Sequence, residues 1–240
     1  VLVEFARQGA ELLASLGLVE VKVAARPRVV ILSTGDEVAP GGKSLGPGQI
    51  YGSNTAALVG LVLAAGGVPL DHGNVPDDPE QLRARFSAAA QAGDLVVSTG
   101  GVSVGDFDHV KGVVGGGIEF WRVAMKPGKP LAFGHLGGKP LFGLPGNPVS
   151  CMVNFLQFVR PLLRTMLGDA HPHLPVISAR IATPRRRGTG RREFVRGVLS
   201  RDAEGFVAEV AGAQGSANLL SMSAAHGYAV VKPSVGFEIG

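Results

Sequence analysis

The sequence contains one cysteine, few aromatic side chains and no long apolar segment. Its 240 residues include one Trp, two Tyr and eleven Phe, and Cys151 is the single cysteine. One cysteine excludes an internal disulfide framework and is typical of a reducing compartment. No unbroken apolar run reaches the roughly 18 residues that a membrane-spanning helix needs, and the N-terminus lacks the layout of a signal peptide. We expect a soluble, cytoplasmic chain with no membrane partner, and the absence of an initiator Met leads us to expect a piece of a longer protein.

Positive charge is concentrated towards the C-terminus. The net charge is +4, from 23 Lys and Arg against 19 Asp and Glu. Residues 1–172 carry 14 of each sign, so the excess comes from residues 173–240, with 9 basic against 5 acidic side chains. Most of it lies in one arginine run: Arg185, Arg186, Arg187, Arg191, Arg192, Arg196 and Arg201. Such a run suits phosphate contacts or a solvated hairpin, and because no DNA- or RNA-binding motif accompanies it, we expect no nucleic-acid partner.

Strand and helix patterns alternate between residues 27 and 170. Continuous apolar runs of strand length occur at 28–33, 68–70, 94–99, 118–123, 131–133 and 141–144. Amphipathic or capped helical segments are expected at 7–18, 55–65, 79–92, 108–114 and 149–167. Strands alternating with helices predict the α/β fold class, here a three-layer αβα sandwich around a largely parallel sheet.

The pattern changes after Pro172. Four short, Val-rich runs follow at 176–183, 193–200, 206–211 and 227–232, separated by Gly-containing turns. This spacing predicts a small all-β, barrel-like domain. We therefore expect two domains: the αβα sandwich at residues 27–170 and the β-domain at residues 171–240.

Four polar or Gly-rich segments each follow a predicted strand: 34–37, 76–79, 99–106 and 145–148. Because open α/β sheets bind ligands at the carboxyl ends of their strands, we expect these segments to converge on one site. In the Gly-rich loop Thr99–Asp106, backbone N–H groups can approach an anion closely, although a plain strand-to-helix turn explains the loop equally well. It matches neither a dinucleotide-binding fingerprint nor a P-loop.

Carboxylates cluster in the same segments. Hard oxygen donors beside a phosphate suit Mg²⁺, which bridges substrate phosphates. The acidic side chains in question are Asp36, Glu37, Asp77, Asp106 and Asp108. The alternative is structural: Asp77 or Asp78 caps the helix at 79–92, and Asp36 belongs to a turn.

Two lysines, Lys126 and Lys129, lie three residues apart on a Pro-flanked loop. Two cations held in this way favour a doubly charged oxyanion, whereas a solvated hairpin tip is the alternative. The segment Pro145–Pro148 opens a long predicted helix and is also explained as an N-terminal cap. Either Ser53 or Asn54 is expected to cap the helix at 55–65.

Other chemistries have little support. The six histidines show no metal-ligand spacing, and no nucleophile elbow is present. Cys151 lies among Met152, Val153 and Phe155 early in a predicted helix, so we interpret it as a core residue.

Taken together in order, these motifs resemble those of the molybdopterin molybdenumtransferase family, which comprises MoeA and the gephyrin E-domain. The matching segments are STGDEV (33–38), GQIYGSN (48–54), PDDP (76–79), STGGVSVGDFD (98–108), MKPGKP (125–130), GLPGNPVS (143–150), EFVRG (193–197) and QGS (214–216). The resemblance covers nearly the whole chain and is most specific between residues 98 and 150.

The resemblance implies insertion of molybdate into adenylylated molybdopterin with release of AMP, dependent on Mg²⁺. It also implies a homodimer in the full-length form and a molybdopterin adenylyltransferase as a possible partner. Full-length members carry two further regions before this segment, of which residues 1–26 resemble a remnant. Two alternatives stay open: the sister adenylyltransferase, which has a TGGTG-like loop where this chain has TGGVS, and a non-enzymatic scaffold of the same family.

The resemblance assigns residues to roles by position. The catalytic positions are Asp108, Asp77, Glu37 and Lys126, with Asp108 and Glu37 as metal ligands. The molybdate positions are Lys126, Lys129, Pro130, Arg196 and Ser216. The pterin and nucleotide positions are Thr34, Gly35, Asp36, Ser53, Asn54, Thr99, Gly100, Gly101, Ser103, Gly105, Pro145, Gly146 and Asn147. Arg122 departs from the pattern, because some members carry Lys there and a planar guanidinium is not equivalent to a point charge.

Overall fold

The computed structural model describes residues 2–101, 117–182 and 190–232. Its central feature is a six-stranded sheet with the strand order β4-β1-β5-β9-β8-β6. The strands are β1 (Arg28–Thr34), β4 (Val68–Val75), β5 (Leu95–Thr99), β6 (Ile118–Arg122), β8 (Pro130–Leu136) and β9 (Lys139–Leu144). The first four in spatial order are parallel, and the β8–β9 hairpin and the edge strand β6 add antiparallel pairs.

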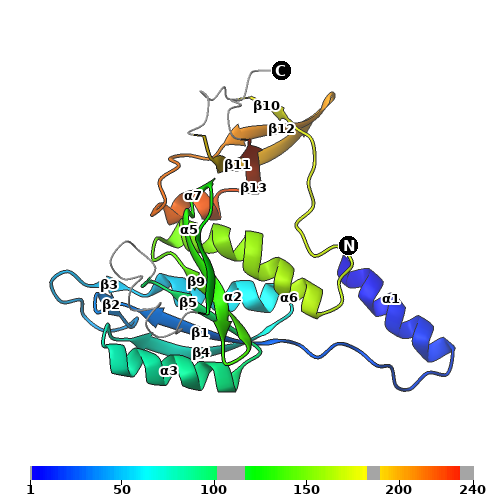
Figure 1. Ribbon diagram of the computed structural model, residues 1–240. Coiled ribbons are helices and arrows are strands. Elements are labelled where there is room, and N and C mark those ends of the chain that lie inside the picture. Colours follow the sequence, from blue (N-terminus) through cyan, green and yellow to red (C-terminus); the bar gives the residue numbers. More distant parts are fainter. Residues whose placement is uncertain (1, 102–116, 183–189, 233–240) are drawn as a thin grey trace.

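Helices cover both faces of this sheet (Figure 1). One face packs against α2 (Ser53–Ala64) and a long C-terminal helix, and the other packs against α3 (Pro79–Ala92). Strand β1 shows why: Val29 and Ile31 belong to the first core, and Val30 and Leu32 to the second. Successive side chains of a strand point to opposite faces, so a continuous apolar run is buried on both. The predicted three-layer αβα sandwich is confirmed.

The long helix contains a π-helical turn that sequence periodicity did not predict. It consists of α5 (Pro148–Asn154), the π-turn η1 (Phe155–Val159) and α6 (Arg160–Met166). A π-turn accommodates one extra residue. Cys151, Phe155, Val159 and Leu163, spaced by four, all reach the same core, which an uninterrupted α-helix would progressively rotate out of line.

The C-terminal region is a small curled sheet with the order β10-β12-β11-β13. Its strands are β10 (Arg180–Ile181), β11 (Arg192–Asp202), β12 (Gly205–Val210) and β13 (Gly227–Val231), and a short helix, α7 (Leu219–Ser223), precedes the last strand. The predicted runs at 193–200, 206–211 and 227–232 correspond to β11, β12 and β13, whereas the run at 176–183 forms only the two-residue β10, and α7 was not predicted. The domain boundaries given above stay predictions.

The two sheets are connected by direct contacts as well as by the chain. Strand β7 (Met125–Lys126), between β6 and β8 in sequence, pairs in parallel with β11 of the C-terminal sheet. An apolar cluster of Met125, Val149, Val153 and Phe194 fills the junction. The Val149 N–H donates to the Ser216 carbonyl at 3.0 Å. The C-terminal sheet therefore lies against the N-terminal end of α5 (Figure 1).

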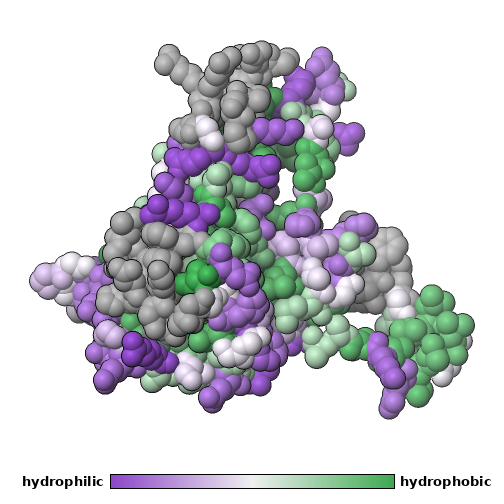
Figure 2. Space-filling view, viewed as in Figure 1, coloured by the Kyte–Doolittle hydropathy of each residue, from purple (hydrophilic) through white to green (hydrophobic). Residues whose placement is uncertain are grey.

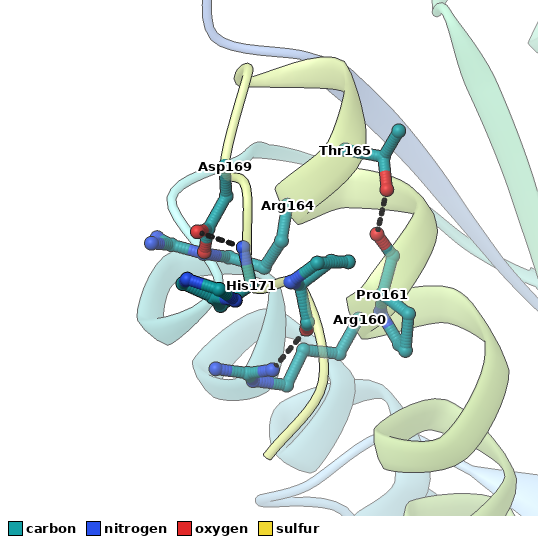
Figure 3. A network of polar contacts seen from close by, with 7 residues as sticks. Arg160, Pro161, Arg164, Thr165, Asp169 and His171 are labelled. Carbon is teal, nitrogen blue, oxygen red and sulfur yellow. Dashed lines mark hydrogen bonds and ion pairs between the residues drawn. The ribbon is translucent and has the colours of Figure 1, made fainter. Parts of the chain in front are cut away.

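The segment that leaves α6 is fixed by a polar network (Figure 3). The Arg164 side chain bonds Asp169 at 2.7 Å, and the His171 N–H donates to the same carboxylate at 2.9 Å. Both interactions lower the pKa of Asp169, and the bond from the His171 backbone has the larger effect. Arg160 donates to the Pro172 carbonyl at 2.6 Å. Beyond this point Val176 is 91% exposed, so the connection to β10 makes little contact.

The N-terminal helix α1 (Leu2–Ser15) begins earlier than predicted and lies apart from the sandwich, joined to it by an extended segment (Figure 1). Leu12, Leu16 and Val19 are exposed, and apolar side chains gather at this end of the molecule (Figure 2). No helix in the described ranges is both long and apolar enough to cross a membrane.

Candidate functional site

The carboxyl ends of three parallel strands meet at one edge of the main sheet. These are Thr34 of β1, Thr99 of β5 and Leu144 of β9. The Gly100 N–H donates to the Leu144 carbonyl at 3.2 Å. Gly100 has a φ of +87°, and a Cβ there would collide with the Thr34 carbonyl oxygen. Only glycine allows this approach, which brings the predicted TGG and LPGN segments together with Thr34.

Asn54 ties these strand ends to helix α2. Its Nδ2 donates to the Thr99 hydroxyl and to the Gly146 carbonyl, both at 2.8 Å. The prediction that Ser53 or Asn54 caps the helix is wrong: the N-cap is Gly52, without a side-chain bond. Asn54 lies inside the first turn, where its side chain points across to the strand ends. Ser53 is exposed at the start of the helix.

A second contact joins the ends of β1 and β4. The Asp77 N–H donates to the Asp36 carboxylate at 3.2 Å, and Asn74 Nδ2 donates to the Gly35 carbonyl at 2.9 Å. Asp78 caps α3 by accepting from the Gln81 N–H. Of the two predicted caps, Asp77 and Asp78, the structure therefore selects Asp78. Glu37 folds back over Gly35, where a Cβ would collide with its carboxylate. Asp36, Glu37 and Asp77 are all exposed at this rim.

These carboxylates fit a hard divalent cation by chemistry, since each offers oxygen donors. Among the described ranges, no group of three or more His, Cys, Asp or Glu side chains is arranged to hold a metal ion. The other predicted ligand, Asp108, lies outside the described residues, as do Ser103, Gly105 and Asp106. The magnesium assignment therefore stays a prediction.

The lysine loop, residues 126–130, runs from β7 into β8. Its backbone is fixed, because the Val123 N–H donates to the Lys129 carbonyl at 3.0 Å. The Lys126–Pro127 peptide bond is cis. The Lys126 ammonium lies 3.9 Å from a carboxylate oxygen of the buried Glu193, and its own side chain is 44% exposed. Lys129 is exposed. The loop thus combines a backbone held by a hydrogen bond with an exposed Lys129 side chain, and its role as an anion site stays a prediction.

Arg196 and Ser216 are brought close together by the C-terminal sheet. Arg196 is fully buried, and its Nη2 donates to the carbonyls of Ala213 and Gly215 at 3.2 Å. Its backbone N–H donates to Gln214 Oε1 at 2.9 Å. The buried cation thus holds the loop that ends at Ser216. Across the sheet, Tyr228 pairs with Arg196; burial raises the pKa of Tyr228 to about 12, and the nearby guanidinium opposes that shift.

Strand pairing places Lys126 and Arg196 in the same sheet. Lys126 is in register with Glu193, three residues before Arg196 on β11. The Ser216 carbonyl in turn contacts the first turn of α5, directly after Pro145, Gly146 and Asn147. Of the predicted molybdate positions, Ser216 is thus tied directly to the strand-end segment, and Lys126 to the strand that carries Arg196. Arg122 is exposed at the end of β6.

A cavity of about 480 Å³ lies at the junction of the two sheets, lined in part by Met125, Phe158, His173, Arg192 and Phe194. None of the described residues that line it is a predicted site residue. We place the candidate site at the strand ends, because the convergence of polar segments is found there and the cavity is lined mainly by residues that join the two halves.

Four side chains that the sequence analysis did not single out support this site: Asn74, Asn154, Glu193 and Gln214. Glu193 had a usable signal, because a carboxylate within a Val- and Phe-rich strand requires a partner. Asn74 and Asn154 bond to residues 39 and 24 positions away and carried no local signal.

Comparison with known proteins is consistent with this arrangement. Residues 30–165 match the family model described as a probable molybdopterin binding domain, and residues 178–240 match the MoeA C-terminal region, domain IV. A molybdopterin molybdenumtransferase of Haemophilus influenzae is 41% identical over 209 residues, covering 85% of this chain and 52% of that protein. One from Nostoc is 38% identical over 220 residues, covering 88% of this chain and 50% of that protein.

The fold matches as well. A molybdopterin biosynthesis MoeA protein from Pyrococcus horikosii superposes with a TM-score of 0.79 at 34% identity, covering 96% of this chain and 56% of that one. The chain thus spans about half the length of the relatives that it matches. Since the molybdopterin-binding domain and the MoeA C-terminal region follow one another here as a single connected unit, the chain belongs to the MoeA family of molybdopterin molybdenumtransferases.

Proposed function

We propose that this chain carries the molybdate-inserting site of a molybdopterin molybdenumtransferase, which transfers molybdate into adenylylated molybdopterin and releases AMP. The observation that carries the proposal is the pairing of β7 with β11, which joins the lysine loop of the sandwich to the strand of Arg196. Names of relatives that are each matched over about half their length support the same activity.

In this proposal, basic side chains bind the molybdate and backbone groups bind the pterin nucleotide. Lys126 and Lys129 supply positive charge for a molybdate dianion, which charge-assisted hydrogen bonds hold most strongly. Buried Arg196 orders the loop of Ser216, whose hydroxyl is a further donor. The pterin nucleotide binds against the backbone of Gly100 and Gly101 and against the segment at Gly146, whose carbonyl accepts from the Asn54 amide. No covalent nucleophile is required, since positioning and charge neutralisation account for the transfer.

Mg²⁺ is part of the proposal. Glu37 and Asp108 would hold the ion, with Asp77 nearby, and when bound it neutralises and polarises the pyrophosphate. We further propose a homodimer in the full-length protein, a molybdopterin adenylyltransferase as the supplier of the substrate and a cytoplasmic location. The last is supported by the buried free thiol of Cys151 and the absence of any other cysteine.

The experiment is molybdate-dependent AMP release from adenylylated molybdopterin with this chain and Mg²⁺. AMP release that saturates with molybdate supports the proposal. ATP consumption without molybdate favours the sister adenylyltransferase instead. Failure to bind the adenylylated pterin at all overturns the proposal and favours a non-enzymatic scaffold.

A further inference from the structure

The lysine loop rests on the buried amide of a single residue, Asn154. Asn154 is 0% exposed at the end of α5. Its Nδ2 donates to the Pro130 carbonyl at 2.9 Å. Its Oδ1 lies against Gly128, so closely that a Cβ on this glycine would collide with it. One side chain therefore contacts the residues on both sides of Lys129.

The element that presents this amide is held firmly. Val149 and Val153 of α5 pack into the junction between the two sheets, and Phe155, the next residue after Asn154, packs into the sandwich core. The π-turn also begins at Phe155, and such turns frequently occur at functional sites. The amide is thus fixed relative to both halves of the candidate site.

Core packing does not explain an asparagine here. A buried amide group is costly unless its hydrogen bonds are made, and Oδ1 accepts none from the described residues. A leucine, which branches at Cγ as asparagine does, would carry no buried polar group and avoid that cost. The contacts that the amide does make are directed at the loop, at Pro130 and Gly128.

We propose that Asn154 is a positioning residue for molybdate, which fixes the backbone on either side of Lys129 and so sets where this ammonium group is held. This rests on the proposed function. The side chain of Lys129 stays exposed while the backbone around it is held by two hydrogen bonds, at the Lys129 and Pro130 carbonyls, and by the close contact of Gly128 with the Asn154 amide. Asn154 itself is buried beneath the loop and is not proposed to touch the anion.

The test is the Asn154→Leu variant in the AMP-release assay. We expect the KM for molybdate to rise about tenfold, while kcat at saturating molybdate and the KM for adenylylated molybdopterin change less than about twofold. Leu163→Ala is the control, because it removes a buried side chain of the same long helix away from the loop. Equal effects on both substrates, or a loss that follows the fall in melting temperature as in Leu163→Ala, would overturn the proposal.

A double-mutant cycle keeps the test independent of how well Asn154→Leu folds. Gly128→Ala should raise the KM for molybdate in the wild-type background, because the new methyl collides with Oδ1. In the Asn154→Ala background the amide is gone, so the same change should have a smaller effect. The strain at φ +99° and the contact with the Met125 methyl, 3.2 Å from the new Cβ, are common to both backgrounds and cancel. Additive effects would contradict the proposal.

The Lys129→Ala variant separates this inference from the proposed function. If Lys129→Ala raises the KM for molybdate and Asn154→Leu does not, only the positioning role fails. If neither variant alters molybdate dependence, or if the wild type shows none, the proposed anion site itself is wrong.

Discussion

The backbone N–H of Val149 donates to the carbonyl of Ser216, 67 positions later in the sequence, and this bond joins the first turn of α5 to the C-terminal region. It lies between two predicted parts of the site: the strand-end segment at Pro145–Asn147 and the loop that Arg196 orders. The C-terminal region is therefore in direct contact with the helix that follows the strand-end segment.

Replacing Lys129 with alanine should weaken the use of molybdate and leave the fold intact, because the side chain is exposed. A charge-assisted hydrogen bond to an anion is strong enough that we expect the KM for molybdate to rise at least about tenfold. Lys139→Ala is the matched control, since Lys139 begins β9 at the end of the sheet opposite the site. Unchanged molybdate dependence in Lys129→Ala would mean that the oxyanion pocket is elsewhere.

The close approach at Gly100 can be measured against a glycine of similar conformation. Gly138 also has a positive φ, but a Cβ there meets nothing within 4 Å. We expect Gly138→Ala to lower the free energy of unfolding by about 1 kcal/mol, from backbone strain alone. Gly100→Ala should cost at least about 3 kcal/mol, because its methyl meets the Thr34 backbone, which cannot move aside. Equal losses in urea denaturation would show that the strand ends are not in contact.

Asn54→Ala should destabilise the protein by about 1–3 kcal/mol, because Thr99 and the Gly146 carbonyl both lose a bonding partner. It should also weaken binding of the adenylylated pterin, since the Gly146 segment is no longer held. Ser53→Ala, the neighbouring exposed position, is the control for stability. Urea denaturation and calorimetric titration measure the two effects; a stability loss equal to that of Ser53→Ala would contradict the prediction.

Asp169 makes stability depend on acid pH. The His171 N–H and the Arg164 side chain lower the pKa of this carboxyl in the folded state. The stabilisation that the charged carboxylate gives to the folded state is therefore complete above a pH of about 4, the ordinary carboxyl pKa. It is lost as the pH falls through the lowered pKa of the folded state. Asp169→Asn should be less stable than wild type at neutral pH and equal to it in strong acid.

Arg164→Gln should show the same convergence with wild type, because its bond needs the charged carboxylate. Melting temperatures measured across the acid range test both variants. A difference that stays constant with pH would show that the loss comes from packing rather than from charge.

Cys151 should resist alkylation in the native protein. The thiol is fully buried, and burial raises its pKa to about 12, against a smaller opposing effect from its bond with Thr99. The thiolate is the reactive form. We expect iodoacetamide to label the chain only after unfolding in guanidinium chloride, as mass spectrometry would show. Rapid labelling of the native protein would mean that the thiol is accessible and reopen a chemical role for it.

The sequence predicted those parts of the fold that carry a local signal. The apolar runs at 28–33 and 94–99 correspond to β1 and β5, and those at 131–133 and 141–144 lie within β8 and β9. The prediction of Cys151 as a core residue is also confirmed. Each of these features depends on hydrophobic pattern or turn residues within a short window.

The features that were missed depend on distant partners. Strand β7 has two residues and exists because Arg192 and Glu193 lie beside it. The two-residue strands β2 (Val38–Ala39) and β3 (Ile50–Tyr51) likewise exist only as a pair. The role of Asn54 was mistaken for a cap because its partners, Thr99 and Gly146, are 45 and 92 residues away. Side-chain bonds of this kind leave no periodic signal in the sequence.

The pairing of β7 with β11 has a consequence for how the chain can be divided. Met125 and Lys126 belong to the sandwich segment in sequence, but they pair with β11 and so form part of the C-terminal sheet. The exposed connection around Val176 therefore links two regions that already contact each other through this strand pair. We expect changes in the length or sequence of the connection to leave the pairing of β7 with β11 intact. Expressing the C-terminal region without the sandwich would instead expose an open strand edge and the apolar face of Phe194.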